Sequence, residues 1–207
     1  SDAVASRQIS RAEKSGKLRK IAPRIYTTNL LDSPEYIVKR NLLDILAWRF
    51  PNAVISHRSA HELRPTDTGD FFLTSTSNQR VTDIPGIHIN VTKGHPALPN
   101  DIAMGSLTIY VASEPRWMLE MMQTSRKKGG ESKSLPTAWI EERLEKMVHA
   151  GGEARLNAFR DSCREVSRQI GLEKEFEKLN RKVGAPGISC VYPVPSSAKF
   201  HISRANG

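Results

Sequence analysis

Seven cationic side chains gather within residues 6–28 of the chain, a stretch that contains one acidic residue, Glu13. Ammonium and guanidinium groups at this density bind phosphates, and arginine or glutamine can also bond a DNA base pair through two hydrogen bonds. Three other interpretations compete: a solvated surface, an acidic protein partner and a membrane surface. Because apolar residues such as Ile9 and Leu18 alternate with the cations, and acids are almost absent, the pattern favours nucleic acid.

The residues of this basic stretch divide by the contacts that we expect them to make. One group, on the exposed face of a helix, is predicted to reach base edges: Arg7, Gln8 and Arg11. The second group is predicted to bind phosphates and so to fix the register on DNA without reading sequence: Lys14, Lys17, Arg19, Lys20 and Arg24. These eight residues form the predicted DNA-binding site.

A helix and a hairpin must position these side chains. Residues 4–15 suit a helix, because Ile9 and Ala12 fall on one stripe and the cations fall on another. Gly16 should end this helix, since glycine adopts the left-handed conformation of a C-cap at little cost. Two short strands then fit, with a turn at Ala22-Pro23-Arg24. A basic helix followed by a basic hairpin is typical of a winged-helix DNA-binding domain.

Histidines and cysteines elsewhere could also do chemistry, but the sequence favours structural roles. His57 and His61 stand four residues apart on an expected helix, a spacing that could hold a metal ion. No third ligand accompanies them, so a packing or capping role is preferred. Cys163 and Cys190 form no CxxC pair, and Cys163 lies on an apolar helical stripe. We therefore expect reduced thiols, with neither a disulfide nor a metal site.

No catalytic constellation is recognisable. A metal-dependent nuclease of one common type needs an acid on one strand and Glu-x-Lys on the next. Asp70 or Asp83 could supply the first acid, but residues 89–93 lack the second. His95 is not followed by the Gly-Asn-Gly anion cradle of a nucleotide transferase, and nucleotide-binding glycine loops are missing. The sequence therefore predicts no enzyme, no catalytic residue and no cofactor.

Composition sets the broad class of the protein. The chain has 207 residues, of which 38% are hydrophobic and 26% charged, as in soluble globular proteins. Its formal net charge of +9 favours polyanionic partners. No apolar run approaches the roughly 18 residues of a membrane span, and the first residues lack the apolar core of a signal peptide. We expect a cytoplasmic protein without a membrane partner.

The expected fold is α+β, with an N-terminal winged helix-turn-helix, a small mixed or antiparallel sheet domain and C-terminal helices. The predicted units are a winged-helix domain over 1–64, a sheet domain over 65–124, a helical region over 134–184 and an irregular tail over 185–207. Predicted helices cover 33–50, 57–63 and 113–122, and three more end at 151–152, 171 and 184. Predicted strands cover 53–55, 71–76, 80–82, 87–92 and 107–111, and a linker covers 125–134.

Three segments resemble AbiEi-type antitoxins of bacterial type IV abortive-infection systems. Residues 14–26 (KSGKLRKIAPRIY) are similar to the end of their winged-helix domain, residues 54–63 (VISHRSAHEL) to a later segment, and residues 111–120 (VASEPRWMLE) to a helix start. Order and spacing agree over roughly residues 6–122. Arg24 replaces the glycine that precedes the tyrosine of the wing. The resemblance implies a transcriptional regulator that binds duplex DNA and a cognate toxin.

The chain also resembles the N-terminal, non-catalytic region of some large Fic-family proteins, from residues 24–29 through 96–101 to 182–184. That resemblance implies the alternative function, a regulatory module that binds a protein partner. Apolar C-terminal stripes and the methionine-rich helix over 113–122 are the candidate partner surfaces, although a buried core role is the plainer interpretation of such methionines. The predicted partners are double-stranded DNA and a toxin or other protein, and homodimer formation is left open.

Overall fold

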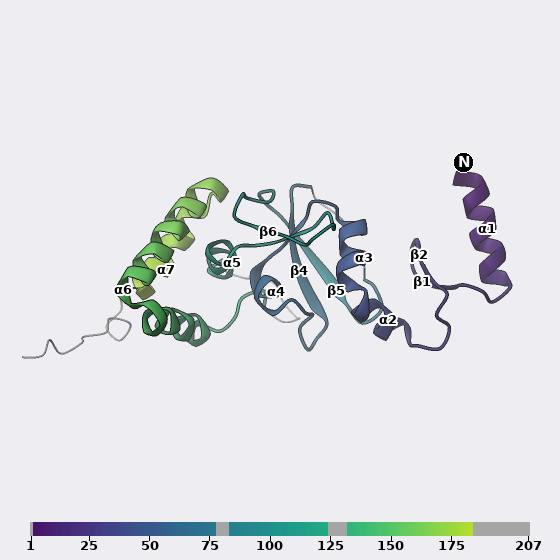
Figure 1. Cartoon of the computed structure of the whole chain (residues 1–207), viewed down its shortest axis with the longest axis horizontal. Coiled ribbons are helices and arrows are strands. Elements are labelled where there is room, and N and C mark those ends of the chain that lie inside the picture. Colours follow the sequence, from purple (N-terminus) through teal and green to yellow (C-terminus); the bar gives the residue numbers. More distant parts are fainter. Residues whose placement is uncertain (1, 78–82, 124–131, 184–207) are drawn as a thin grey trace, which may run out of the picture.

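The computed structural model describes residues 2–77, 83–123 and 132–183. These residues form helices and two small sheets, which confirms the α+β class (Figure 1). The helices are α1 (Asp2–Lys14), α2 (Pro34–Arg40), α3 (Leu42–Arg49), α4 (His57–Glu62), α5 (Glu114–Met121), α6 (Thr137–Ile170) and α7 (Glu173–Val183). The strands are β1 (Arg19–Ala22), β2 (Ile25–Thr27), β3 (Val54–Ile55), β4 (Asp70–Ser75), β5 (His88–Lys93), β6 (Ile102–Ala103) and β7 (Tyr110–Val111).

The larger sheet is mixed, in the order β5-β4-β3-β7-β6. Its central strand β3 runs antiparallel to β4 and parallel to β7, and β4 runs parallel to β5. Every residue of β4 is buried, because strands flank it on both sides and α4 packs against it. The boundary expected between residues 64 and 65 therefore falls between two hydrogen-bonded strands of one sheet.

Helices cover this sheet, and Figure 1 shows α3 on one side of it and α5, α6 and α7 on the other. The residues expected to form the buried stripe of α2 and α3 are buried as predicted: Ile37, Leu42, Ile45, Leu46 and Phe50. Trp48, expected in the core or an interface, is 56% exposed. Ser33 caps α2 as predicted, since its hydroxyl oxygen accepts the Tyr36 N–H at 3.2 Å.

The single helix expected over residues 33–50 is wrong, because the chain leaves the helical conformation at Asn41 (φ −111°, ψ 25°). The Asn41 amide nitrogen donates to the Ile37 carbonyl at 2.7 Å, and its backbone N–H bonds the carbonyls of Ile37 and Val38. Asparagine can compete in this way with the regular helical hydrogen bonds of its own backbone. Two short helices therefore replace one long one.

The C-terminal helices follow the expected stripes, and two of the three expected glycines interrupt or cap them; the third, Gly184, lies outside the described residues. Helix α6 is interrupted at Gly152 (φ 65°, ψ −169°), and Gly171 (φ 71°) caps its second half. The side chains that these helices bury belong to the same core as the sheet: Ile140, Leu144, Met147, Val148, Leu156, Cys163, Val166, Phe176 and Leu179. The helical region over 134–184 therefore shares its core with the sheet rather than standing apart.

Several expected elements differ in extent or lie outside the described residues. Only Tyr110–Val111 of the strand expected over 107–111 forms as β7, and its neighbour β6 was not expected. The strand over 80–82, most of the linker over 125–134, Cys190 and the tail over 185–207 lie outside the described residues. None of the helices among the described residues is both long and apolar enough to cross a membrane.

Candidate functional site

Helix α1 exposes the predicted base-reading face. Arg7, Gln8, Arg11 and Lys14 are all exposed, and none makes an ion pair with a described acid. Arg7, Arg11 and Lys14 follow one another at four- and three-residue spacing, so they lie along one side of the helix. The half-buried Ile9 lies on the opposite side. The face is thus free to contact a ligand.

The end of α1 has the conformation that the sequence predicts. Gly16 adopts φ +69°, and its backbone N–H bonds the Glu13 carbonyl at 3.0 Å. The next two N–H groups, of Lys17 and Leu18, both bond the Ala12 carbonyl, at 2.9 and 3.2 Å. This glycine cap turns the chain from α1 directly into β1. Lys17 is exposed at the turn.

The strands β1 and β2 form the expected antiparallel hairpin, with Lys20 opposite Tyr26 and Ala22 opposite Ile25. Ala22 is buried in the main core, and Ile25 packs against that core. These contacts fix the turn end of the hairpin, beside Pro23-Arg24, to the core. Lys20 is exposed, so the hairpin can hold its ammonium group toward a ligand.

Arg24, at the turn of the hairpin, adopts φ +64°. This left-handed region is uncommon for residues other than glycine, and a turn that has proline followed by such a residue is of type II. It is the position where the expected antitoxin pattern has glycine. The turn forms with arginine there at some conformational cost, and the Arg24 side chain is exposed.

Arg19 does not join the exposed cations. Its side chain is half-buried, and its Nη2 donates to the carbonyl oxygens of Asn29 (3.3 Å) and Asp32. The guanidinium thus joins the hairpin to the loop before α2. These carbonyls occupy Nη2 and give Arg19 a structural role, while its phosphate contact stays a prediction.

The loop that receives Arg19 is ordered by Asn29, a residue that the sequence analysis missed. Its side-chain oxygen accepts the N–H groups of Leu31 and Asp32, both at 3.1 Å, and its amide nitrogen donates to the Asp32 carboxylate at 2.7 Å. Asparagine commonly stabilises turns through such local hydrogen bonds, so the residues Asn29-Leu30-Leu31-Asp32 could have predicted this turn. Leu31 is 98% exposed at the tip.

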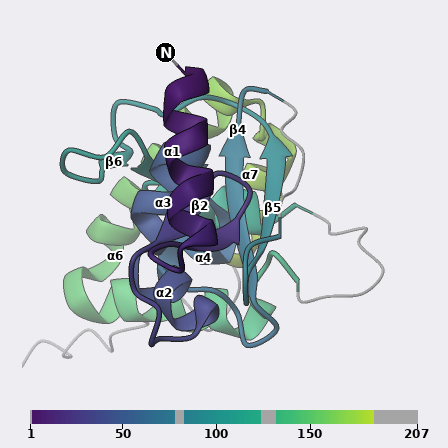
Figure 2. The same ribbon diagram turned by 90° about the vertical axis from the view of Figure 1, so that its right-hand side faces the viewer.

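The basic helix stands at one end of the molecule. Figure 1 shows α1 beyond the hairpin, at the opposite end from α6 and α7, and Figure 2 looks onto α1 with the hairpin behind it. No residue of α1 belongs to the hydrophobic core among the described residues. The exposed cations of α1 and of the hairpin therefore lie at this end of the molecule. Together with Gln8 they are called the basic surface below: Arg7, Gln8, Arg11, Lys14, Lys17, Lys20 and Arg24.

The predicted structural roles of the histidines and of Cys163 fit their positions. His57 is buried, whereas the His61 ring lies against those of Trp117 and Trp139, with centroids 5.4 and 4.5 Å away. Among the described residues, no group of three histidine, cysteine or acidic side chains could hold a metal ion. Burial raises the pKa of the Cys163 thiol, which leaves it unreactive.

A buried ion cluster lies between α5 and the loop that precedes β6. Arg116 is 0% exposed, and it pairs with Asp101 (Nη1 to Oδ2, 2.6 Å) and with Glu120 (Nε to Oε1, 3.1 Å). It also donates to the carbonyls of His95 and Pro96, at 2.7 and 2.8 Å. The three charged side chains, of Arg116, Asp101 and Glu120, are removed from water, so their charges and hydrogen bonds depend on one another.

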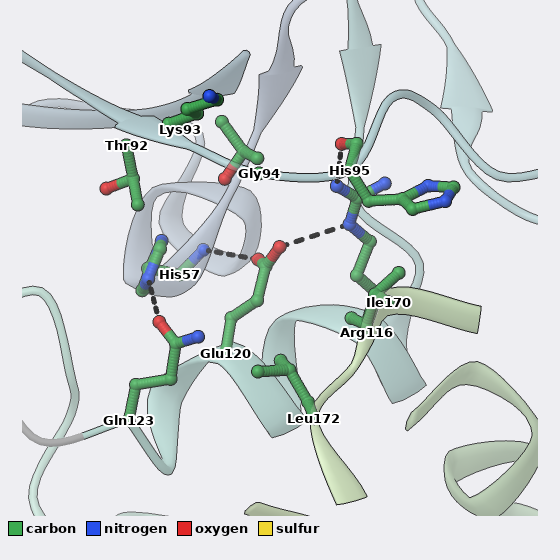
Figure 3. Close-up of a pocket in the computed structure, with 11 residues that line it drawn as sticks. His57, Thr92, Lys93, Gly94, His95, Arg116, Glu120, Gln123, Ile170 and Leu172 are labelled. Atoms are coloured by element: carbon green, nitrogen blue, oxygen red, sulfur yellow. Dashed lines mark hydrogen bonds and ion pairs between the residues drawn. The ribbon is translucent and has the colours of Figure 1, made fainter. Parts of the chain in front are cut away.

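His57 extends this cluster through α4. Its backbone N–H donates to Glu120 Oε2 at 3.2 Å, and its Nδ1 accepts the Ser56 hydroxyl at 2.9 Å. Its Nε2–H faces Gln123 Oε1 at 3.4 Å (Figure 3). The same oxygen accepts a hydrogen bond from Lys133 Nζ at 3.0 Å. His57 itself has φ +53°, a strained backbone conformation of a kind often found at functional sites.

Burial shifts the pKa values of His57 and Glu120 in opposite directions. Desolvation, with a contribution from Lys133, lowers the pKa of His57 to about 3, so the ring is neutral near pH 7. Desolvation raises the pKa of Glu120, although Arg116 and the His57 N–H oppose this. Neither Arg116 nor Glu120 was predicted from the sequence as a site residue. The sequence did contain an indication of this pair, because Arg116 and Glu120 are oppositely charged residues at four-residue spacing, with Trp117, Met118 and Leu119 between them.

Comparisons of the chain with models of known protein families, with curated proteins and with solved structures found no match.

Proposed function

We propose that the chain is a DNA-binding transcriptional regulator of the antitoxin type, which reads duplex DNA with α1 and contacts the DNA backbone with the β1–β2 hairpin. The observation that carries the proposal is the basic surface. Its cations are exposed, project from one end of the molecule and make no ion pair with a described acid. Cations so placed release counterions when they bind phosphates, which is the main source of affinity for DNA.

The size of α1 suits the major groove. Thirteen helical residues span about 20 Å at 1.5 Å per residue, and the major groove is about 12 Å wide and admits one helix. Arg7, Gln8 and Arg11 then reach base edges, while Lys20 and Arg24 lie along the backbone as in a winged helix. The resemblance to AbiEi-type antitoxins, which rests partly on residues 14–26, supports the same arrangement.

A protein partner, a cognate toxin in the antitoxin resemblance, remains the second part of the proposal. The apolar residues that suggested its binding surface are largely internal: Met118 and Met121 are buried in α5, and the stripes of α6 and α7 pack in the core. Deleting residues 134–207 would therefore expose the core rather than remove one function. Partner binding has to be tested on the intact chain.

The experiment that tests DNA reading is salt-dependent binding to the DNA upstream of the protein's own gene and to a scrambled duplex. The intact chain is compared with an Arg7→Ala/Arg11→Ala variant. Tight binding to the upstream DNA alone, lost in the variant, supports a sequence-reading regulator. Equal, weak binding to both duplexes that does not change in the variant contradicts it and favours the protein-interaction module.

Replacing Arg11 with alanine is expected to cost about 1–3 kcal/mol of binding free energy and to relax specificity at one base position. Arginine bonds a guanine edge through two hydrogen bonds, and alanine cannot replace either. Binding measured against duplexes that carry each base at every position checks this. A uniform loss at all positions would assign Arg11 to phosphate instead.

Replacing Lys20 with methionine is expected to weaken binding to all duplexes alike and to lower the slope of log K against log salt by about 0.9, the value for one phosphate contact. Lys174→Met is the matched control, because Lys174 is an exposed cation on α7, at the opposite end of the molecule. Equal changes in the two variants would mean that net charge, rather than the hairpin, governs the slope.

A further inference from the structure

A cavity of about 120 Å³ lies beside the ion cluster, and its described lining includes no residue of α1 or of the β1–β2 hairpin. Its walls come from the carboxyl ends of β4 and β5, from α5, and from the corner between α6 and α7 (Figure 3). The two strands are parallel and in register there, Thr74 opposite Thr92. In open sheets that contain parallel strands, ligands commonly bind just beyond this end of the strands.

The cavity contains hydrogen-bond donors without partners. Thr74 is 4% exposed and lines the cavity, yet its hydroxyl makes no hydrogen bond to any described group. A buried hydroxyl in this state is costly, and such groups normally bond water or a ligand. The Gln123 amide nitrogen is also available, since only the oxygen of that amide is bonded within the described chain.

The charges around the cavity favour an anion. Lys93 lies at its rim, exposed and without an ion pair to a described acid, and Lys133 lies behind Gln123. Among the described residues of the wall, the one carboxylate is that of Glu120, which has one oxygen bonded to Arg116 and the other to the His57 N–H. The groups that remain free to meet a ligand are therefore donors, and at least one carries a positive charge.

We propose that this cavity binds a small oxyanion, a phosphate group, through the hydroxyl of Thr74, the ammonium of Lys93 and the amide of Gln123. The volume is that of a few water molecules and suits a group of this size. Ile170 and Leu172 supply an apolar wall beside the polar groups, where a short carbon chain attached to the phosphate can lie. This site is independent of the proposed DNA-binding function.

The test is an NMR titration of the intact chain with inorganic phosphate, followed at the backbone amides of residues 92–95 and 120–123. Because phosphate also collects at the basic surface, only signals around the cavity are scored. We expect a saturable shift there. Thr74→Val, which keeps the shape of the side chain, and Lys93→Met should each weaken binding by about tenfold, since each removes one bond to a charged ligand.

Lys39→Met, which removes an exposed cation on α2 outside this cavity, should leave the affinity unchanged. A parallel titration with glycerol phosphate separates the two sources of the ligand: tighter binding than phosphate indicates a phosphate ester, and weaker binding indicates free phosphate. Two results would overturn the proposal. One is the absence of a saturable shift at the backbone amides around the cavity. The other is equal affinity for phosphate in the intact chain, Thr74→Val and Lys93→Met.

Discussion

Replacing Arg116 with methionine is expected to lower the free energy of unfolding by about 3–5 kcal/mol. The guanidinium is completely buried and pairs with Asp101 and Glu120, so its removal leaves two carboxylates in the interior without their cation. It would also free the carbonyls of His95 and Pro96, which lie in the loop before β6. Urea unfolding followed by circular dichroism measures the loss.

Arg143→Met provides the matched control. Arg143 pairs with Glu114 at 2.6 Å, but both side chains are about one-third exposed, and such pairs contribute at most about 1 kcal/mol. Adding Glu120→Gln to Arg116→Met should recover part of the loss, because it removes one of the two unpaired charges. Equal losses for Arg116→Met and Arg143→Met would mean that the buried cluster contributes no more than a surface pair.

Acid is expected to destabilise the protein through His57. In the unfolded chain this ring titrates near pH 6.5, whereas in the fold its pKa is about 3. Between these values the unfolded state binds more protons, so stability falls as the pH is lowered, by up to about 1.4 kcal/mol per pH unit. The contribution is complete above pH 6.5 and lost as the pH falls toward 3.

The comparison of the intact chain with His57→Asn isolates this contribution. Asparagine tolerates the positive φ of the position and does not titrate, so the variant should lose less stability than the intact chain when the pH is lowered from 7 to 4. Glu120 acts in the opposite sense because its pKa is raised, but its carboxylate remains in both proteins.

His88→Asn is the surface control, since the His88 side chain is 59% exposed and pairs with an exposed Asp83. Unfolding measured at several pH values should give parallel curves for this variant and the intact chain. The same acid dependence in the intact chain and in His57→Asn would exclude His57 as the cause.

The features that the sequence predicted correctly depend on local chemistry and on periodicity. Gly16 and Gly171 end helices because glycine accepts a positive φ, and Ser33 begins α2 because its hydroxyl meets a free N–H. Gly152 interrupts α6 where the apolar stripes change phase. These signals lie within a few residues of the feature that they specify, so one sequence is enough to read them.

The features that it missed depend on residues far apart in the chain. Arg19 is occupied by carbonyls ten and thirteen residues away, and nothing in a basic run distinguishes it from its exposed neighbour Lys20. Arg116 meets Asp101 across the two strands β6 and β7. Strand β3 pairs with β4 and β7, which the short strand itself cannot specify. Periodicity predicts the existence of a strand more reliably than it predicts the strand with which it pairs.

The position of α1 outside the core has a thermodynamic consequence. A helix of thirteen residues is only marginally stable in water on its own, and α1 contributes no residue to the core among the described residues. Whatever surface α1 docks against therefore also completes its folding. Binding through α1 should release less free energy than binding through a rigid helix with the same contacts. Part of the free energy of the contacts offsets the conformational entropy that the backbone of α1 loses.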